Sequence, residues 1–287
     1  MIQIASHTSS TQNSPVRIQE YAVGIFDTLP TKSALKKAIK KGLVYVNGIK
    51  ANTGTYIYGN ETISLYALTP TSKPSKTFDL ALEVLFEDEY LAVINKPAGI
   101  VVSGNSFATI NNALPQNLEK STLTDATVPR PVHRLDYPTS GVLLIGKTTS
   151  SIIQLNALFE KKNIQKTYHA IAIGSLNKQG SFEAPIDSKN ATTQYQVLQH
   201  VASQKFNRLN LVELRPSTGR KHQLRKHLFA NKTPILGDKT YFLDGLLLNG
   251  NGLYLHASTL EFTHPFTSKP IKITAKLPKK FTRIFPL

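Results

Sequence analysis

The sequence predicts an α+β fold with a mainly antiparallel sheet, and three observations support this prediction. From about residue 80 onward, short apolar runs separated by turns are frequent, as in LEVLFEDEYLAVINK, VLLIGKT and LNLVELRP. Only two stretches there, SIIQLNALFEKK and KHQLRKHLFA, read as helices, and many strands with few helices favour antiparallel pairing. No G-x-G-x-x-G or G-x-x-x-x-G-K-[ST] motif occurs, so a Rossmann or P-loop nucleotide-binding unit is not supported.

The chain length of 287 residues suggests two domains. The segment TPTSKPSKT, residues 69–77, has no apolar periodicity and reads as a linker. The first residues are rich in Ser, Thr, Gln and Asn, which favours disorder. We therefore expect a disordered segment over 1–17, a small α/β domain over 18–68, the linker over 69–77 and a large domain over 78–287.

The charge balance is strongly basic. The chain has 34 Lys and Arg against 18 Asp and Glu, a net charge of +16, which attracts polyanions at long range. Nucleic acid is the leading partner, and a protein that is basic only for solubility is the alternative. No amphipathic helix carries bulky aromatic residues opposite its lysines, so an anionic membrane surface is disfavoured.

Several classes of chemistry lack their markers. The absence of cysteine excludes disulfides, thiolate catalysis and zinc sites built on Cys. No H-E-x-x-H motif or G-x-S-x-G elbow occurs, and we expect neither a metal nor a cofactor. The N-terminus does not resemble a signal peptide, and no apolar stretch has the length of a membrane span. These observations predict a cytoplasmic protein, and we take a monomer as the default.

The segment LPTKSALKKAIKKGLVYVNGIK predicts a basic helix followed by a hairpin. Thr31 can cap the helix and Gly42 marks its end, while an Asn47-Gly48 turn joins the two strands. One side of the helix is apolar, and the lysines on the other side repel one another unless an anion neutralises them. A solvated lysine face is the alternative interpretation. The candidate RNA-binding residues are Lys32, Lys36, Lys37, Lys40 and Lys41.

In the large domain, polar residues gather at strand ends. Asp136 in HRLDYPTSG has a simple structural explanation, because Asp, Pro and Gly are the residues that a tight turn requires. Tyr168 alone could be a strand aromatic, and Arg225 alone could be a surface charge on a helix. Their functional interpretation depends on the motifs around them.

Those motifs, taken in order, resemble the RluA-type pseudouridine synthases. They are INKPAGIVV, HRLDYPTSG, KTYHA, TGRKHQLRKH, PILGDKTY and LHASTLEFTHP, and the resemblance covers residues 80–275. His133 before Arg-Leu-Asp favours this branch over the related small-subunit type, while Tyr137-Pro138 replaces a more common charged pair. The segment 18–66 resembles a small RNA-binding module of a ribosomal small-subunit protein.

The resemblance implies the pseudouridine synthase fold and isomerisation of uridine in RNA, with ribosomal RNA favoured over transfer RNA. It assigns the essential carboxylate to Asp136, its basic partner to Arg225, and stacking with proton transfer to Tyr168. The target base must be flipped out of its helix, and Arg134 is the candidate to brace the gap. The candidate substrate-binding residues are His133, Arg134, Leu135, Thr139, Arg220, His222 and Gln223.

Two other functions share these features. A non-catalytic RNA-binding or ribosome-assembly protein would have the same charge and the same N-terminal module. The combination of Asp136, Tyr168 and Arg225 argues against it, because a carboxylate beside phosphates only weakens binding. An RNA hydrolase using Asp136 with His133 is weaker still, because no second carboxylate or metal set accompanies them.

Overall fold

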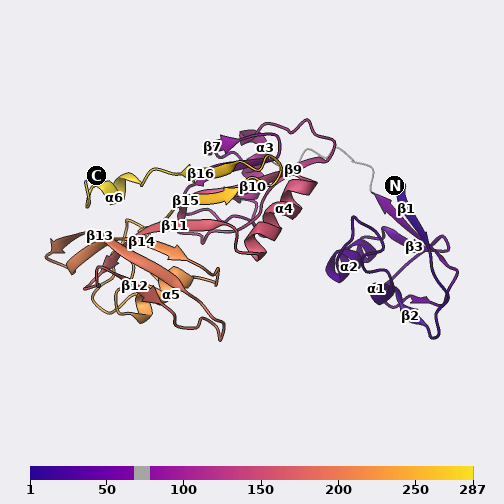
Figure 1. The fold of residues 1–287 in the computed structure, drawn as a ribbon, viewed down its shortest axis with the longest axis horizontal. Helices are drawn as coiled ribbons and strands as arrows, with labels where there is room; N and C mark the ends of the chain where they lie inside the picture. The colour runs from indigo at the N-terminus through magenta and orange to yellow at the C-terminus, as the bar shows by residue number, and fades with distance from the viewer. Residues whose placement is uncertain (68–77, 287) are drawn as a thin grey trace. The chain divides into compact units, whose positions relative to one another are not determined.

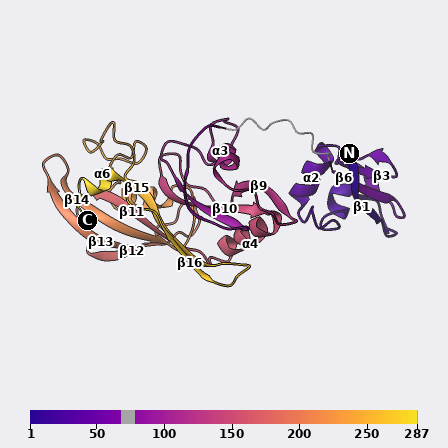
Figure 2. The ribbon, with the colours of Figure 1, turned by 90° about the horizontal axis from the view of Figure 1, so that it is seen from above.

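The computed structural model describes residues 1–67 and 78–286, drawn in Figures 1 and 2. The chain divides into two compact units, one ending at Ser75 and one beginning at Lys76. The linker expected over 69–77 lies outside the described residues. Among the helices of the described ranges, none is long and apolar enough to cross a membrane.

The first unit is a small sheet with helices packed against it. Its four-stranded sheet has the order β1-β6-β3-β4, and β2 and β5 form a separate pair. The elements are β1 (Ile2–Thr8), β2 (Val16–Arg17), α1 (Ile18–Tyr21), α2 (Lys32–Lys40), β3 (Val44–Val46), β4 (Ile49–Lys50), β5 (Tyr56–Ile57) and β6 (Thr62–Ala67).

The basic helix and its hairpin form as the sequence predicts. The Thr31 hydroxyl accepts the Ala34 N–H at 3.2 Å and so caps α2, and Gly42 ends the helix with a φ of +68°. Asn47 and Gly48, with φ of 47° and 76°, make the tight turn between β3 and β4. The apolar side of α2 is buried in the core of the unit through Leu35, Ala38 and Ile39.

The expectation that residues 1–17 are disordered is wrong. Strand β1 pairs antiparallel with β6 from Ile2 opposite Ala67 to Thr8 opposite Thr62. Beyond it, the Ser9 hydroxyl donates to the Glu61 carboxylate at 2.6 Å. Ile2 remains 60% exposed, so a backbone ladder holds this strand with little apolar burial. Amino-acid composition indicates how much apolar surface a segment can bury. It therefore does not detect a strand that is held mainly by backbone hydrogen bonds.

The second unit is built on one large mixed sheet with the strand order β12-β13-β14-β11-β15-β10-β8-β7, to which β16 adds at β15 and β9 at β10. The strands are β7 (Glu83–Glu87), β8 (Leu91–Lys96), β9 (Ala126–Pro131), β10 (Ser140–Thr148), β11 (Gln165–Ile173), β12 (Gln179–Phe182), β13 (Thr193–Ser203), β14 (Asn207–Pro216), β15 (Leu255–Thr263) and β16 (Pro270–Thr274). Every described pair is antiparallel except β10 with β15, which confirms the predicted fold class.

Helices cover the two halves of this sheet separately. The helices are α3 (Ile110–Asn117), α4 (Thr149–Glu160), α5 (Gln223–Ala230) and α6 (Lys279–Thr282). Helices α3 and α4 lie against the β9–β10 half, and α5 lies with the β13–β14 half (Figure 1). Two apolar cores result, and the ring of Tyr168 on β11 packs against both of them.

The two halves meet where β10 runs parallel to β15. Ser140 pairs with His256 and Gly141 pairs with Ala257 at this junction. Gly141 has a φ of +115°, and a Cβ placed there would lie 2.0 Å from the Ala257 carbonyl oxygen. Only glycine permits both the backbone conformation and the close approach. The junction places the turn before β10 close to Tyr168, because β15 alone separates β10 from β11.

We predict that Gly141→Ala lowers the free energy of unfolding by roughly 2–4 kcal/mol, from the clash with the Ala257 backbone and the strained φ together. Gly245→Ala is the matched control, because its φ is +78° and no atom lies within 4 Å of its added Cβ. The control should cost only about 1 kcal/mol. Urea unfolding of both variants measures the difference, and equal losses would contradict the close contact.

Candidate active site

A cavity of about 650 Å³ lies in the larger unit, where the loop after β9, strand β11 and the start of α5 meet. Its lining combines apolar walls with several cations and one carboxylate, that of Asp136. The lining residues are Val132, His133, Arg134, Leu135, Asp136, Thr139, Phe159, Lys166, Tyr168, Pro216, Thr218, Gly219, Arg220, Lys221, His222, Gln223, Leu224, Arg225 and Leu255.

The turn that carries Asp136 is fixed from beneath by a buried lysine. The Thr139 N–H donates to the Asp136 carbonyl at 3.0 Å and closes the turn. Lys96 has no exposed surface, and its ammonium donates to the carbonyls of Thr139 and Pro97, both at 2.8 Å. Burial lowers the pKa of Lys96 to about 8, and the Asp136 charge opposes this shift. Lys96 is therefore a cation at neutral pH, joined to the loop that follows it and to the turn that carries Asp136.

Arg225 reaches Asp136 from α5. Its Nη1 lies 3.5 Å from the Asp136 carboxylate, which is 27% exposed to solvent. The other side of the guanidinium is clamped by buried Asp238, with Nε and Nη2 donating at 2.6 and 2.8 Å. Asp238 also accepts the Thr240 and Tyr241 N–H groups at 2.9 and 3.0 Å. The clamp fixes Arg225 and leaves one of its edges facing Asp136.

His222 lies at the start of α5 in the left-handed region, with a φ of 55°. Its Nε2 is 3.8 Å from the Asp136 carboxylate, and its Nδ1 bonds the Tyr241 hydroxyl at 3.0 Å. Burial lowers the pKa of His222, although the Asp136 charge opposes the effect. The imidazole is thus disfavoured as a permanent cation beside Asp136, which leaves Arg225 as the charged partner.

Tyr168 forms a wall of the cavity. Burial raises the pKa of its hydroxyl, and the Asp136 charge raises it further. The hydroxyl therefore keeps its proton at neutral pH. Since the ring packs against both apolar cores, it offers a rigid surface to a planar ligand.

His133 and Gln223 have their side chains engaged by the protein. The Leu144 N–H donates to His133 Nε2 at 2.9 Å, so the neutral ring carries its proton on Nδ1. Burial lowers the pKa of His133 to about 3, which keeps the ring neutral. Gln223 accepts from the Thr218 hydroxyl at 2.7 Å and the Arg220 N–H at 3.0 Å, and so holds the loop before α5.

The structure brings the three candidate catalytic residues together, since Asp136, Tyr168 and Arg225 all line this cavity. All seven candidate substrate-binding residues line it as well. Among these, Leu135 is buried in a core, whereas Arg134 and Arg220 are exposed. The five candidate RNA-binding lysines belong to the other unit.

Sequence reasoning assigned no role to three residues that shape the site. Lys96, Lys166 and Asp238 stand in the motifs INKPAGIVV, KTYHA and PILGDKTY. The motifs thus contained these three residues, but a position in a turn or strand does not show which residues a side chain will contact in the folded protein. Within the described ranges, no cluster of His, Asp and Glu could hold a metal ion.

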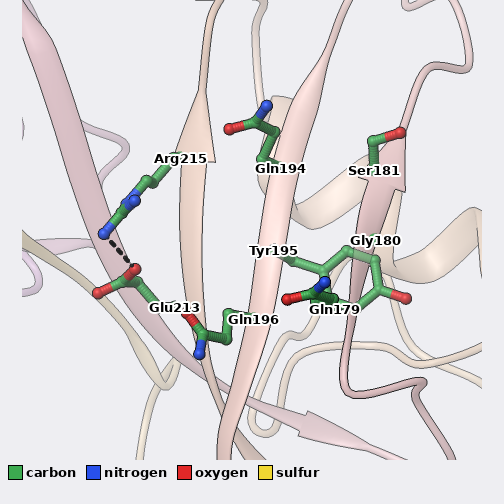
Figure 3. Close-up of a pocket in the computed structure, with 8 residues that line it drawn as sticks. All are labelled: Gln179, Gly180, Ser181, Gln194, Tyr195, Gln196, Glu213 and Arg215. Carbon is green, nitrogen blue, oxygen red and sulfur yellow. Dashed lines mark ion pairs between the residues drawn. The ribbon is translucent and has the colours of Figure 1, made fainter.

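A second hollow of about 390 Å³ lies over β12, β13 and β14 and contains none of the predicted site residues. Figure 3 shows its polar lining of amide and hydroxyl groups, with Arg215 paired to Glu213 at 2.8 Å. Arg215 and Glu213 are the charged residues of this lining, and their opposite charges leave the hollow without net charge. The first cavity is therefore the better candidate for catalysis.

The comparisons with known proteins show the family of the chain. Residues 90–230 match the family model of RNA pseudouridylate synthase. The chain is 32% identical to the ribosomal large subunit pseudouridine synthase D of Xanthomonas campestris pv. campestris, over 88% of this chain and 83% of that protein. It is 32% identical to the tRNA pseudouridine synthase C of Vibrio vulnificus, over 71% of this chain and 94% of that protein. The solved structure of human RNA pseudouridylate synthase domain containing 4 is 28% identical, with a TM-score of 0.56 over 70% of this chain and 90% of that one.

The fold and these relatives define an RNA-modifying isomerase. The chain belongs to the RNA pseudouridylate synthase family, as its motifs predicted, and converts uridine in RNA into pseudouridine.

We predict that Asp238→Asn lowers the free energy of unfolding by roughly 3 kcal/mol, because it leaves the buried Arg225 cation without its clamp. It should also lower turnover, since Arg225 is then free to leave Asp136. The matched control is Glu261→Gln, which breaks the exposed pair with Lys272 and should cost about 0–1 kcal/mol. Urea unfolding and tritium release from uridine carbon 5 measure the two effects. Normal turnover in Asp238→Asn would show that Arg225 needs no clamp.

Proposed function

We propose that this enzyme modifies uridines in ribosomal RNA and that Asp136 is its essential catalytic carboxylate. The observation that carries the second part is that Asp136 supplies the one carboxylate among the lining residues of the cavity. For the first part, ribosomal large subunit enzymes stand among the relatives that match 88% and 96% of the chain. Transfer RNA is the alternative, since a tRNA enzyme is also a relative.

The reaction breaks the N-glycosidic bond, turns the uracil and rejoins it to the ribose through carbon 5. A carboxylate can assist as a nucleophile toward the ribose or as a base, and it must be ionised for either role. Two cations stand near the Asp136 carboxylate, Arg225 at 3.5 Å and the buried Lys96, whose ammonium bonds the Thr139 carbonyl. Its partial exposure leaves the carboxylate accessible to a nucleotide.

Tyr168 would stack against the target uracil and assist the proton transfer at carbon 5. In the product the proton of carbon 5 has left that carbon, and N1 has gained one. A hydroxyl with a raised pKa is a poor source of phenolate, but it can accept a proton on oxygen while it donates its own. The burial of Tyr168 therefore favours a relay over a permanent base.

The nucleotide must leave its helix before it reaches Asp136, at a cost of a few kcal/mol. Arg134 is exposed, lines the cavity and makes no hydrogen bond or ion pair with the residues that the structure describes. Its guanidinium can stack on bases as well as bind phosphate. We assign it the role of filling the gap that the flipped uridine leaves.

The N-terminal unit would bind RNA through α2. Lys37, Lys40 and Lys41 are exposed, and none of them has a carboxylate partner within the described ranges. Lys32 differs, because it pairs with Glu20 at 2.5 Å. Unpaired like charges along one helix face are stabilised by an anion, and the RNA backbone would supply it.

We predict that Asp136→Asn abolishes turnover while RNA affinity holds or rises, since the change keeps the shape and removes a negative charge near phosphates. The assay is tritium release from carbon 5 of uridine in transcripts of large-subunit ribosomal RNA and of transfer RNA. Asp244→Asn, an exposed carboxylate outside the cavity, is the matched control. Multiple turnover by Asp136→Asn would refute its assignment, and release from transfer RNA alone would refute the ribosomal substrate.

We predict that replacing Lys36, Lys37, Lys40 and Lys41 with Gln weakens RNA binding and leaves the unit folded, because Gln keeps helix propensity and relieves repulsion. Each lost phosphate contact should make the slope of log K against log salt shallower by about 0.7–0.9. Binding titrations at several salt concentrations measure the slope, and thermal unfolding checks the fold. An unchanged slope would mean that the lysine face is merely solvated.

A further inference from the structure

The cavity has more positive charge than its own carboxylate can neutralise. Arg134, Lys166, Arg220 and Lys221 all line it, and none of them forms an ion pair with a described carboxylate. The two arginines and Lys221 are exposed, so water can solvate them. Lys166 differs from them, because the protein covers much of its side chain.

Lys166 lies on β11, two residues before Tyr168. Burial lowers the pKa of its ammonium, and it donates no hydrogen bond to any residue that the structure describes. Its charge contributes to the lowered pKa of His133, which remains neutral and gives it no compensation. A partly desolvated cation without a partner destabilises a fold, so its presence in a ligand cavity indicates an anion from outside the protein.

The loop before α5 lies close to the Lys166 ammonium. A Cβ added to Gly219 would lie 3.8 Å from Lys166 Nζ, so this loop faces the ammonium at a point that carries no side chain. Gly219 is not among the residues with positive φ, and its backbone therefore does not demand glycine. Gln223 fixes the loop through Thr218 and the Arg220 N–H. The space beside Lys166 is thus bounded by a rigid wall.

We infer that Lys166 is a substrate-binding residue that takes the phosphodiester next to the target uridine. The uracil is neutral, so the backbone phosphate is the anionic part of the substrate nearest to the reacting ribose. This inference deepens the proposed function, and requires an RNA substrate but not a ribosomal one. Anchoring that phosphate would hold the ribose in place while the base detaches, turns and rejoins.

The first test uses whichever transcript, ribosomal or transfer RNA, releases tritium with the wild-type enzyme. Lys166→Met keeps the length of the side chain and removes its charge, and Lys166→Arg keeps the charge. Lys269→Met is the control, since Lys269 is an exposed lysine outside the cavity lining. We expect Lys166→Met to raise Kd roughly 10- to 100-fold, the range of a hydrogen bond to a charged group.

The salt slope of Lys166→Met should also be shallower by about 0.7–0.9, while Lys166→Arg and Lys269→Met keep the wild-type slope. Thermal unfolding of Lys166→Met should be unchanged or shifted upward, because an unpaired desolvated charge has been removed. An unchanged affinity and slope, or an equal loss in Lys269→Met, would overturn the inference. A lowered melting temperature with a normal slope would assign Lys166 a structural role instead.

A second test locates the phosphate. After the modified uridine has been mapped by chemical labelling, short RNAs carry a single neutral methylphosphonate on its 5′ or 3′ side. If Lys166 contacts one of these phosphates, that substitution weakens wild-type binding and has little further effect in Lys166→Met. Fully additive losses at both positions would overturn the inference. Tritium release by the wild type tests the ribosomal proposal separately, so the failure of one is distinguishable from the failure of the other.

Discussion

The turn that carries Asp136 depends on one buried ammonium. Lys96 donates to the carbonyls of Pro97 and Thr139, and its third acceptor is the Tyr137 carbonyl at 3.4 Å. Buried carbonyls that lacked this donor would each leave an unsatisfied acceptor in the core. A single side chain thus joins the end of β8 to the turn before β10, and it places positive charge beneath Asp136. The buried core therefore fixes the position of the Asp136 carboxylate, although Asp136 itself stands on a surface turn.

The second support comes from the other half of the sheet. Asp238 holds Arg225 by two short hydrogen bonds, and the Arg225 guanidinium lies over the Tyr241 ring at 4.9 Å. Asp136 therefore stands where two separately packed halves meet, and the backbone contact at Gly141 sets their spacing. Rigid supports of this kind suit a reaction in which the base must detach and rejoin without leaving the site.

The sequence predicted the fold class, the basic helix and ten of the nineteen residues that line the cavity, because each rests on a local pattern or an ordered set of motifs. The N-terminal strand was missed, since its pairing with β6 depends on residues about sixty positions away and buries little apolar surface. The roles of Lys96 and Asp238 were missed for a related reason. Their partners Thr139 and Arg225 are 43 and 13 positions away, and only the folded sheet brings them into contact.

The depressed pKa of Lys96 makes its contribution to folding depend on pH in alkaline solution. Its folded value of about 8 lies below its ordinary value of 10.5, so the unfolded chain binds more protons between these limits. The contribution of Lys96 to folding stability therefore rises with pH across this window. In the same window Lys96 loses the positive charge that it places near Asp136. Alkaline conditions would thus remove a cation from beside the Asp136 turn while they relieve the cost of burying it.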